Sequence, residues 1–184
     1  LKEEYMPGNF VLVDQFIERP VSRENTLFGE GCVAQVSFSQ PIADRLQHAL
    51  HNTCLDLGLP SHLGGTYICM EGPQFSTLAE SNLYRSWGCD VIGMTNMPEA
   101  KLAREAELPY ATVAMVTDYD CWHPDHEAVS VESVIKVIEK NRDNANLLLK
   151  NALPRIKVRP NEDIQGGDRA LDFARVTSPE NRDP

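Results

Sequence analysis

The chain has 184 residues, with 17 Lys and Arg against 27 Asp and Glu, and hence a formal charge of −10. This acidic balance argues against nucleic acid and anionic membranes as main partners, because both would repel most of the protein surface. The length corresponds to one domain, or one domain with a small appendage, and no run of 18 apolar residues is present to span a membrane.

The first part of the chain predicts one strand and one helix. Residues 10–16, which follow the turn residues Pro7-Gly8-Asn9, are mostly apolar and predict a buried strand. The apolar pattern lapses from Arg19 to Gly31, which indicates a surface loop. Apolar residues then recur at helical spacing from Pro41 to Leu57, and Gly58 is a suitable helix end.

Between residues 66 and 117 short β-rich runs alternate with helical patterns. We expect strands at 66–70, 90–94 and 110–117, with helices at 77–87 and 98–107 between them. Thr77 and Glu80 form the T-x-x-E pattern that is typical of a capping box. This alternation predicts an α/β fold with a largely parallel, helix-covered sheet.

The last third of the chain predicts a long helix and a polar arm. An apolar stripe from Val131 to Leu149 predicts a helix that begins at Ser130 and stops before Pro154. Beyond Pro154 the sequence is polar and broken by proline and glycine. We therefore expect residues 1–154 to form the core of the domain and residues 155–184 a peripheral arm.

Polar residues follow three of the predicted strands. In open α/β sheets ligands bind beyond the carboxyl ends of the strands, which here are followed by residues 71–76, 93–96 and 117–120. Each of these segments combines polar groups or glycine with a large apolar side chain. That combination favours a pocket for a flat heterocycle and a sugar.

Asp118 and Asp120 lie two residues apart, which in an extended backbone places both carboxylates on one side. Two close, partly buried carboxylates do not both ionise cheaply, so one is expected to be protonated near neutral pH. Such a pair suits the N7 acceptor and the exocyclic amine of a purine. The alternative interpretation is a solvated loop or a helix cap.

Three further groups have both a functional and a structural interpretation. Phe75 can stack on a base or belong to the core, and Thr95 can hold an anion or, like Asn96, cap a helix. A dense set of possible metal ligands comprises His123, Asp125, His126 and Glu127, but Pro124 breaks helical spacing and no second cluster fits a zinc pattern, so we expect no metal. Five cysteines without a C-x-x-C pair are expected to be reduced thiols, which favours a cytoplasmic location.

Taken together, the motifs resemble the trimeric purine nucleoside phosphorylase family. Those that carry the resemblance are Gly64-Gly65-Thr66-Tyr67, Glu71-Gly72-Pro73-Gln74-Phe75-Ser76, Ala79-Glu80-Ser81, Trp87-Gly88-Cys89-Asp90-Val91-Ile92-Gly93-Met94-Thr95 and Pro98-Glu99-Ala100-Lys101-Leu102-Ala103-Arg104-Glu105. Thr117-Asp118-Tyr119-Asp120-Cys121-Trp122 narrows the resemblance to the branch that acts on methylthioadenosine. The resemblance implies a phosphorylase/hydrolase-like three-layer α/β/α sandwich around a mixed, largely parallel sheet.

The implied activity is phosphorolysis of S-methyl-5'-thioadenosine to adenine and 5-methylthioribose 1-phosphate, in a homotrimer that uses inorganic phosphate as co-substrate and no cofactor. At matching positions Asp118 would protonate purine N7 and Asp120 would hold the 6-amino group. Relatives that act on 6-oxopurine nucleosides have asparagine at the position of Asp118, so the aspartate here favours adenine as the base of the substrate. Other implied roles are base packing by Phe75, ribose contact by Met94, phosphate binding by Thr95, lining of the methylthio pocket by Val131 and Val134, and substrate contacts by Ser76, Gly93 and Thr117.

Two departures from the family pattern leave alternatives open. Gln35 stands where relatives usually have a histidine that reaches the neighbouring subunit's 5'-pocket, so a purine nucleoside or methylthioinosine phosphorylase is the enzymatic alternative. We also expect this chain to be an interior portion that lacks an N-terminal phosphate loop and a last helix. A non-catalytic nucleoside-binding or assembly protein is the second alternative.

Overall fold

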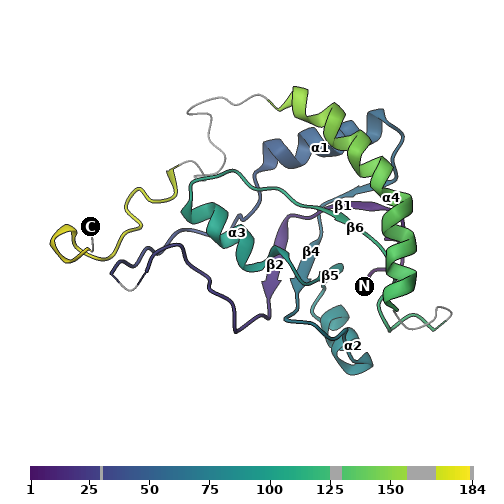
Figure 1. Ribbon diagram of the computed structural model, residues 1–184, viewed down its shortest axis with the longest axis horizontal. Coiled ribbons are helices and arrows are strands. Elements are labelled where there is room, and N and C mark those ends of the chain that lie inside the picture. The colour runs from purple at the N-terminus through teal and green to yellow at the C-terminus, as the bar shows by residue number, and fades with distance from the viewer. Residues whose placement is uncertain (30, 125–129, 157–168, 183–184) are drawn as a thin grey trace.

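The computed structural model describes residues 1–29, 31–124, 130–156 and 169–182 (Figure 1). The strands are β1 (Phe10–Leu12), β2 (Gln15–Glu18), β3 (Ser61–Leu63), β4 (Thr66–Cys69), β5 (Val91–Gly93) and β6 (Val113–Met115). The helices are α1 (Asp44–Asp56), α2 (Leu78–Ser86), α3 (Asn96–Glu105) and α4 (Val131–Ala152), with short 3-10 turns at Leu153–Arg155 and Pro179–Asn181. Within the described residues every helix is too short or too polar to cross a bilayer.

The strands form two three-stranded sheets, with the orders β3-β1-β6 and β2-β4-β5. Only the β1–β6 pairing is antiparallel among the described strands, so the mixed, largely parallel arrangement is confirmed. The single strand expected at residues 10–16 is wrong, because β1 and β2 belong to different sheets. The chain changes sheets at Asp14, where Leu12 accepts a hydrogen bond from the Gly64 amide and Asp14 donates one to the Gly65 carbonyl.

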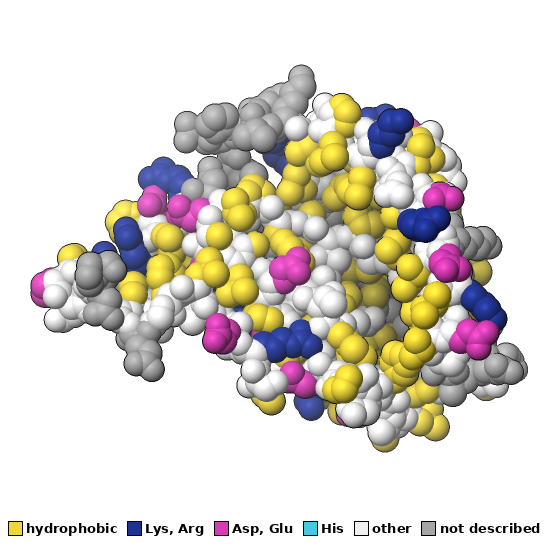
Figure 2. All heavy atoms as spheres, viewed as in Figure 1, with side chains coloured by type: hydrophobic (Ala, Val, Ile, Leu, Met, Phe, Trp, Pro, Cys, Tyr) yellow, Lys and Arg dark blue, Asp and Glu magenta, His cyan; other side chains and the backbone are white. Residues whose placement is uncertain are grey.

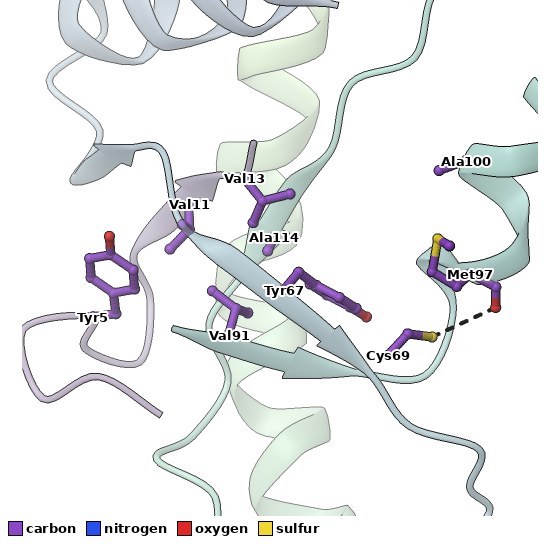
Figure 3. Packing of buried hydrophobic residues seen from close by; sticks show 9 residues of the cluster. All are labelled: Tyr5, Val11, Val13, Tyr67, Cys69, Val91, Met97, Ala100 and Ala114. Carbon is purple, nitrogen blue, oxygen red and sulfur yellow. Dashed lines mark hydrogen bonds between the residues drawn. The ribbon is translucent and has the colours of Figure 1, made fainter. Parts of the chain in front are cut away.

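β1 is covered on both faces, and its side chains alternate between them. Phe10 and Leu12 pack with α1 and α4, in a cluster that includes Leu50 and Leu148. Val11 and the adjoining Val13 point the other way, into a cluster shared with β4, β5 and the start of α3 (Figure 3). Burial on both faces explains the continuous apolar run in the sequence.

The second sheet lies between α2 and α3. Ile68 of β4 packs with Tyr84 of α2, whereas its neighbours Tyr67 and Cys69 face Met97 and Ala100 of α3. Helices therefore cover both faces of the strands, and the three-layer α/β/α arrangement is confirmed. It brings the carboxyl ends of β4 and β5 together beside α4 (Figure 1).

The helix starts follow from local sequence, with one correction. The predicted capping box of α2 is confirmed, since Thr77 Oγ1 accepts from the Glu80 amide at 3.2 Å and Glu80 Oε2 accepts from the Thr77 amide at 2.8 Å. Ser130 caps α4 in the same way with Ser133. Pro41 does not open α1, which begins at Asp44, because residues 42 and 43 are buried in extended or irregular backbone.

Two segments outside the sheets pair with each other. Ala34 forms an antiparallel bridge with Arg175, and the Gln35 amide donates to the Ala174 carbonyl at 2.8 Å. Figure 1 shows this pair at the left, away from the helices that flank the sheets. Apolar side chains are exposed in and next to these segments, namely Val33, Val176 and the fully exposed Phe173. The division of the chain at residues 154 and 155 stays a prediction, and part of the predicted arm, 157–168, lies outside the described residues.

Candidate functional site

A pocket of about 170 Å³ lies beyond the carboxyl ends of β4 and β5, next to α4. It is lined by two residues of β5, by the segments that follow β4, β5 and β6, and by one residue of α4. In chain order the lining residues are Met70, Phe75, Ser76, Ile92, Gly93, Met94, Thr117, Asp118, Asp120 and Val134. The structure thus brings together eight of the eleven residues that the sequence proposed for the site.

Hydrophobic side chains gather along α4, and the molecule is hollowed beside them (Figure 2). Val134 lines the pocket itself, while Ile135 and Ile138 are exposed on the same helix. Opposite α4, Phe75 lies in the segment after β4 and keeps 44% of its surface exposed. Phe75 is therefore a pocket wall and not a core residue.

Asp118 is held in place by two donors from its own loop. Thr117 Oγ1 donates to Asp118 Oδ2 at 2.6 Å, and the Asp120 amide donates to Asp118 Oδ1 at 2.8 Å. The second bond requires a turn, and Asp120 has a φ of 59°, which aspartate tolerates better than most residues. The expected extended backbone through this pair is therefore wrong, and a turn brings the two carboxyl groups into one loop.

Asp120 is buried, with 7% of its surface exposed, so the alternative of a solvated loop does not describe it. Its Oδ2 atom is buried and has no hydrogen-bond partner among the described residues. Burial raises the pKa of Asp120, and the charge of Asp118 raises it further, although the nearby Ser81 hydroxyl lowers it in part. The pair therefore keeps one carboxyl group able to hold a proton above the usual range of aspartate.

Two glycines, one in the pocket lining and one beside it, are required by close packing. A Cβ at Gly93 would lie 1.9 Å from the hydroxyl oxygen of Tyr67, so this backbone packs directly on the tyrosine. A Cβ at Gly72, whose φ is 71°, would lie 2.8 Å from the sulfur of Met94. Burial raises the pKa of Tyr67, whose oxygen also faces Thr95 and the Asn96 amide. The turn from Gly93 to Asn96 is thus built around one buried phenol.

Three predicted residues do not line this pocket. Thr95 is exposed at the start of α3, next to Met94, and its side chain makes no capping hydrogen bond. Val131 is 64% exposed at the start of α4. Gln35 is exposed and pairs through its backbone with Ala174, so it lies outside the pocket of its own chain.

Two lining residues, Met70 and Ile92, were absent from the sequence-based set. Both lie within predicted strands, where an apolar residue is normally part of the core. Met70 is the last residue of its predicted strand, and this position was the signal that could have identified it, whereas Ile92, in the middle of its strand, carried no such signal. Strand ends in an α/β sheet contribute apolar side chains to ligand pockets.

The structure describes His123 but not Asp125, His126 or Glu127. His123 lies against aromatic rings, with its ring centroid 4.8 Å from that of Tyr119 and 5.0 Å from that of Trp122. Among the residues that are described, no three His, Cys, Asp or Glu side chains are placed to hold a metal ion. All five cysteines are free.

Comparison with known proteins places this geometry in a family. The sequence pattern of the phosphorylase superfamily matches residues 1–154, which include every lining residue of the pocket. The chain belongs to the phosphorylase superfamily. Its α/β fold is that of the superfamily, as similarity to solved structures also shows.

Relatives in the superfamily are similar over the whole chain. An S-methyl-5'-thioadenosine phosphorylase of Rhodospirillum rubrum is 56% identical over 184 residues, all of this chain and 63% of the relative. The enzyme of the same name from Bradyrhizobium diazoefficiens has the same identity and coverage. The chain thus spans under two thirds of the length of these curated relatives.

Two solved structures of the superfamily superpose on the chain. A methylthioadenosine phosphorylase from an antarctic soil metagenomic library has a TM-score of 0.89 and 43% identity, over 99% of this chain and 64% of the other. A methylthioadenosine phosphorylase of Schistosoma mansoni in complex with adenine has a TM-score of 0.89 and 28% identity, over 95% of this chain and 69% of the other.

Proposed function

We propose that the protein phosphorolyses S-methyl-5'-thioadenosine, giving adenine and 5-methylthioribose 1-phosphate. The observation that carries the proposal is the pairing of buried Asp120 with Asp118 in a pocket whose other walls are Phe75 and Met94. A purine base leaves the sugar with the help of a proton donor and binds by packing on apolar side chains, and this pocket offers both. The names and full-chain identity of the relatives support the same substrate.

The reaction breaks the bond between the sugar C1' and purine N9, and it forms a bond between C1' and a phosphate oxygen. A purine leaves readily only if a proton reaches N7 as the bond breaks, because the base then departs neutral. We assign this proton to the Asp118–Asp120 pair. In the free protein burial raises the pKa of Asp120, which favours a proton on that carboxyl group. When a nucleoside is bound, the purine N7 faces Asp118 and favours the proton on that carboxyl group. Asp120 then accepts a hydrogen bond from the 6-amino group of the purine.

The remaining roles that we propose are those that the family resemblance implies. Phe75 packs on the base, Met94 lies under the ribose, and Val134 meets the methylthio group, with Val131 at the rim. Thr95, exposed and free of a capping bond, faces the phosphate. Ser76, Gly93 and Thr117 complete the substrate contacts. Inorganic phosphate is the co-substrate, and the proposed mechanism uses no metal or cofactor.

We propose that the protein works as a cytoplasmic homotrimer in purine and methionine salvage. The exposed apolar groups of the paired segments 33–35 and 174–176, including Val33 and Val176, support burial against another copy. In such an assembly Gln35 would reach the 5'-pocket of the neighbouring subunit. Glutamine retains the hydrogen-bonding capacity of the histidine usual there.

The decisive experiment assays the full-length protein with phosphate and four nucleosides: methylthioadenosine, adenosine, inosine and methylthioinosine. We expect the highest kcat/KM for methylthioadenosine. A preference for inosine or methylthioinosine would favour the enzymatic alternative. Adenine binding without phosphorolysis of any of the four would favour a non-catalytic nucleoside-binding protein.

A further inference from the structure

Arg23 lies in the segment between β2 and α1 that the sequence assigned only to a surface loop. Its side chain is largely covered, with 28% of its surface exposed. The guanidinium group donates to three backbone carbonyl oxygens: Nη1 to Met94 at 2.6 Å and to Met97 at 2.7 Å, and Nη2 to Glu71 at 2.8 Å. The Glu71 carboxylate is farther away, at 3.8 Å from Nε.

These carbonyl groups belong to two different loops of the pocket. Glu71 precedes Gly72 and the Phe75 wall, whereas Met94 and Met97 bracket the turn that carries Thr95. One planar group therefore spans the loop that holds the base and the turn that holds sugar and phosphate. Arginine suits this task because its donors are fixed in a rigid fork, while lysine offers a single point of charge.

The backbone on both sides of Arg23 is itself anchored, at one end to Glu71 and at the other to the last residue of α3. Glu71 accepts hydrogen bonds from the Val21 amide at 2.6 Å and the Ser22 hydroxyl at 2.7 Å. These bonds lower the pKa of Glu71, so it stays ionised as an acceptor. At the other end, buried Glu105 of α3 accepts from the Leu27 amide at 2.6 Å. Arg23 is thus fixed from both sides and does not swing freely.

We propose that Arg23 is a positioning residue, which sets the separation between the Glu71–Phe75 loop and the Met94–Met97 turn and so shapes the pocket for nucleoside and phosphate together. This inference rests on the proposed function. Arg23 touches no reacting atom, and it acts through the backbone of residues that do. Misplacement of such groups by about 1 Å costs about 10²-fold in rate.

The test compares Arg23→Met and Arg23→Lys with the unmodified full-length protein. We expect Arg23→Met to raise KM for both methylthioadenosine and phosphate, and to lower kcat/KM by about 10²-fold. Arg23→Lys should restore only part of this loss, because an ammonium group does not bridge both loops. The pH profile of kcat should stay unchanged, since the carboxyl pair is untouched. Arg142→Met, at an exposed arginine of α4, is the matched control and should have no effect.

A purely structural role gives a different result. Loss of folded protein lowers kcat and leaves both KM values unchanged, and that outcome for a folded Arg23→Met would overturn the inference. If Arg23→Met does not fold, unchanged KM values in Arg23→Lys overturn it instead. Adenine binding by calorimetry separates the two proposals: binding without turnover in the unmodified protein contradicts the proposed function, whereas an adenine Kd that both Arg23 variants leave unchanged contradicts the role of Arg23.

Discussion

The two sheets differ in what they contribute to the molecule. In β3-β1-β6 the central strand β1 is fully buried, and its residues serve only packing. In β2-β4-β5 the ends of β4 and β5 continue into segments that line the candidate pocket. The carboxyl pair Asp118 and Asp120, to which we assign proton transfer, nevertheless follows β6, an edge strand of the first sheet. If the proposed function is right, substitutions that follow the two sheets should affect proton transfer and base packing to different extents.

The largest effect is expected from Asp118→Asn, which removes the carboxyl group that we propose as the acid. We expect kcat for methylthioadenosine to fall by about 10²- to 10⁴-fold, because an amide does not protonate N7. The ratio of turnover with 6-oxopurine nucleosides to turnover with methylthioadenosine should therefore rise in this variant. Steady-state assays with methylthioadenosine and inosine measure both effects, and Asp56→Asn, at an exposed residue of α1, is the control. An unchanged rate would remove Asp118 from the mechanism.

Phe10→Ala tests the packing role of β1. Phe10 is fully buried between β1 and the helices α1 and α4, so we expect a loss of about 3–5 kcal/mol in the free energy of unfolding. Urea unfolding measures the loss, and activity per folded molecule should be preserved. Leu63→Ala, at an exposed residue of the neighbouring β3, should cost less than about 1 kcal/mol. Equal losses of unfolding free energy for Phe10→Ala and Leu63→Ala would contradict the view that the central strand β1 contributes more packing than the edge strand β3.

Asp120→Asn tests the pKa of the buried carboxyl. Because its folded-state pKa is raised above 3.8, the unfolded chain releases this proton first, and stability should fall as pH rises from 3.8 through the folded pKa. The asparagine variant lacks this loss, so its stability relative to the unmodified protein should increase over that interval. Urea unfolding across the pH range measures the difference, with exposed Asp143→Asn as control. Parallel pH curves for the two proteins would show that Asp120 is not perturbed.

The smallest effect concerns the helix that follows the Phe75 loop. Thr77→Ala removes the capping box of α2 and should cost about 1 kcal/mol of stability, with a modest rise in KM because Phe75 lies two residues away. Thr77→Ser keeps the capping oxygen and should behave like the unmodified protein. Thermal unfolding and nucleoside KM measure both effects. A Thr77→Ser variant as unstable as Thr77→Ala would indicate that the methyl group, not the cap, matters.

Much of the fold follows from local patterns in the sequence. The capping box at Thr77 predicts α2, and the apolar stripe after Ser130 predicts α4, each within one or two residues. β3 escaped prediction, because Ser61, His62 and Leu63 are too few and too polar to show a strand period. The division of residues 10–16 between two sheets depends on pairing with Gly64 and Gly65, which no local pattern encodes.

The site divides in a similar way. Residues beyond strand ends, such as Phe75 and Asp118, were proposed from position and chemistry, and the structure brings them into one pocket. The sequence did not predict that Tyr67 and Arg23 shape the pocket. A tyrosine within a strand is normally part of the core, and a single arginine in a loop is normally on the surface. Their importance lies in contacts with backbone atoms about 25 to 70 residues away along the chain.

The contact between Gly93 and Tyr67 restricts the order in which this protein can change. With Tyr67 in place, any side chain at position 93 meets its hydroxyl and ring, so alanine is blocked there. Once residue 67 shrinks to an aliphatic side chain, the same alanine finds room. Directed evolution of the pocket would therefore reach new side chains at position 93 along one route only, in which the core changes before the site.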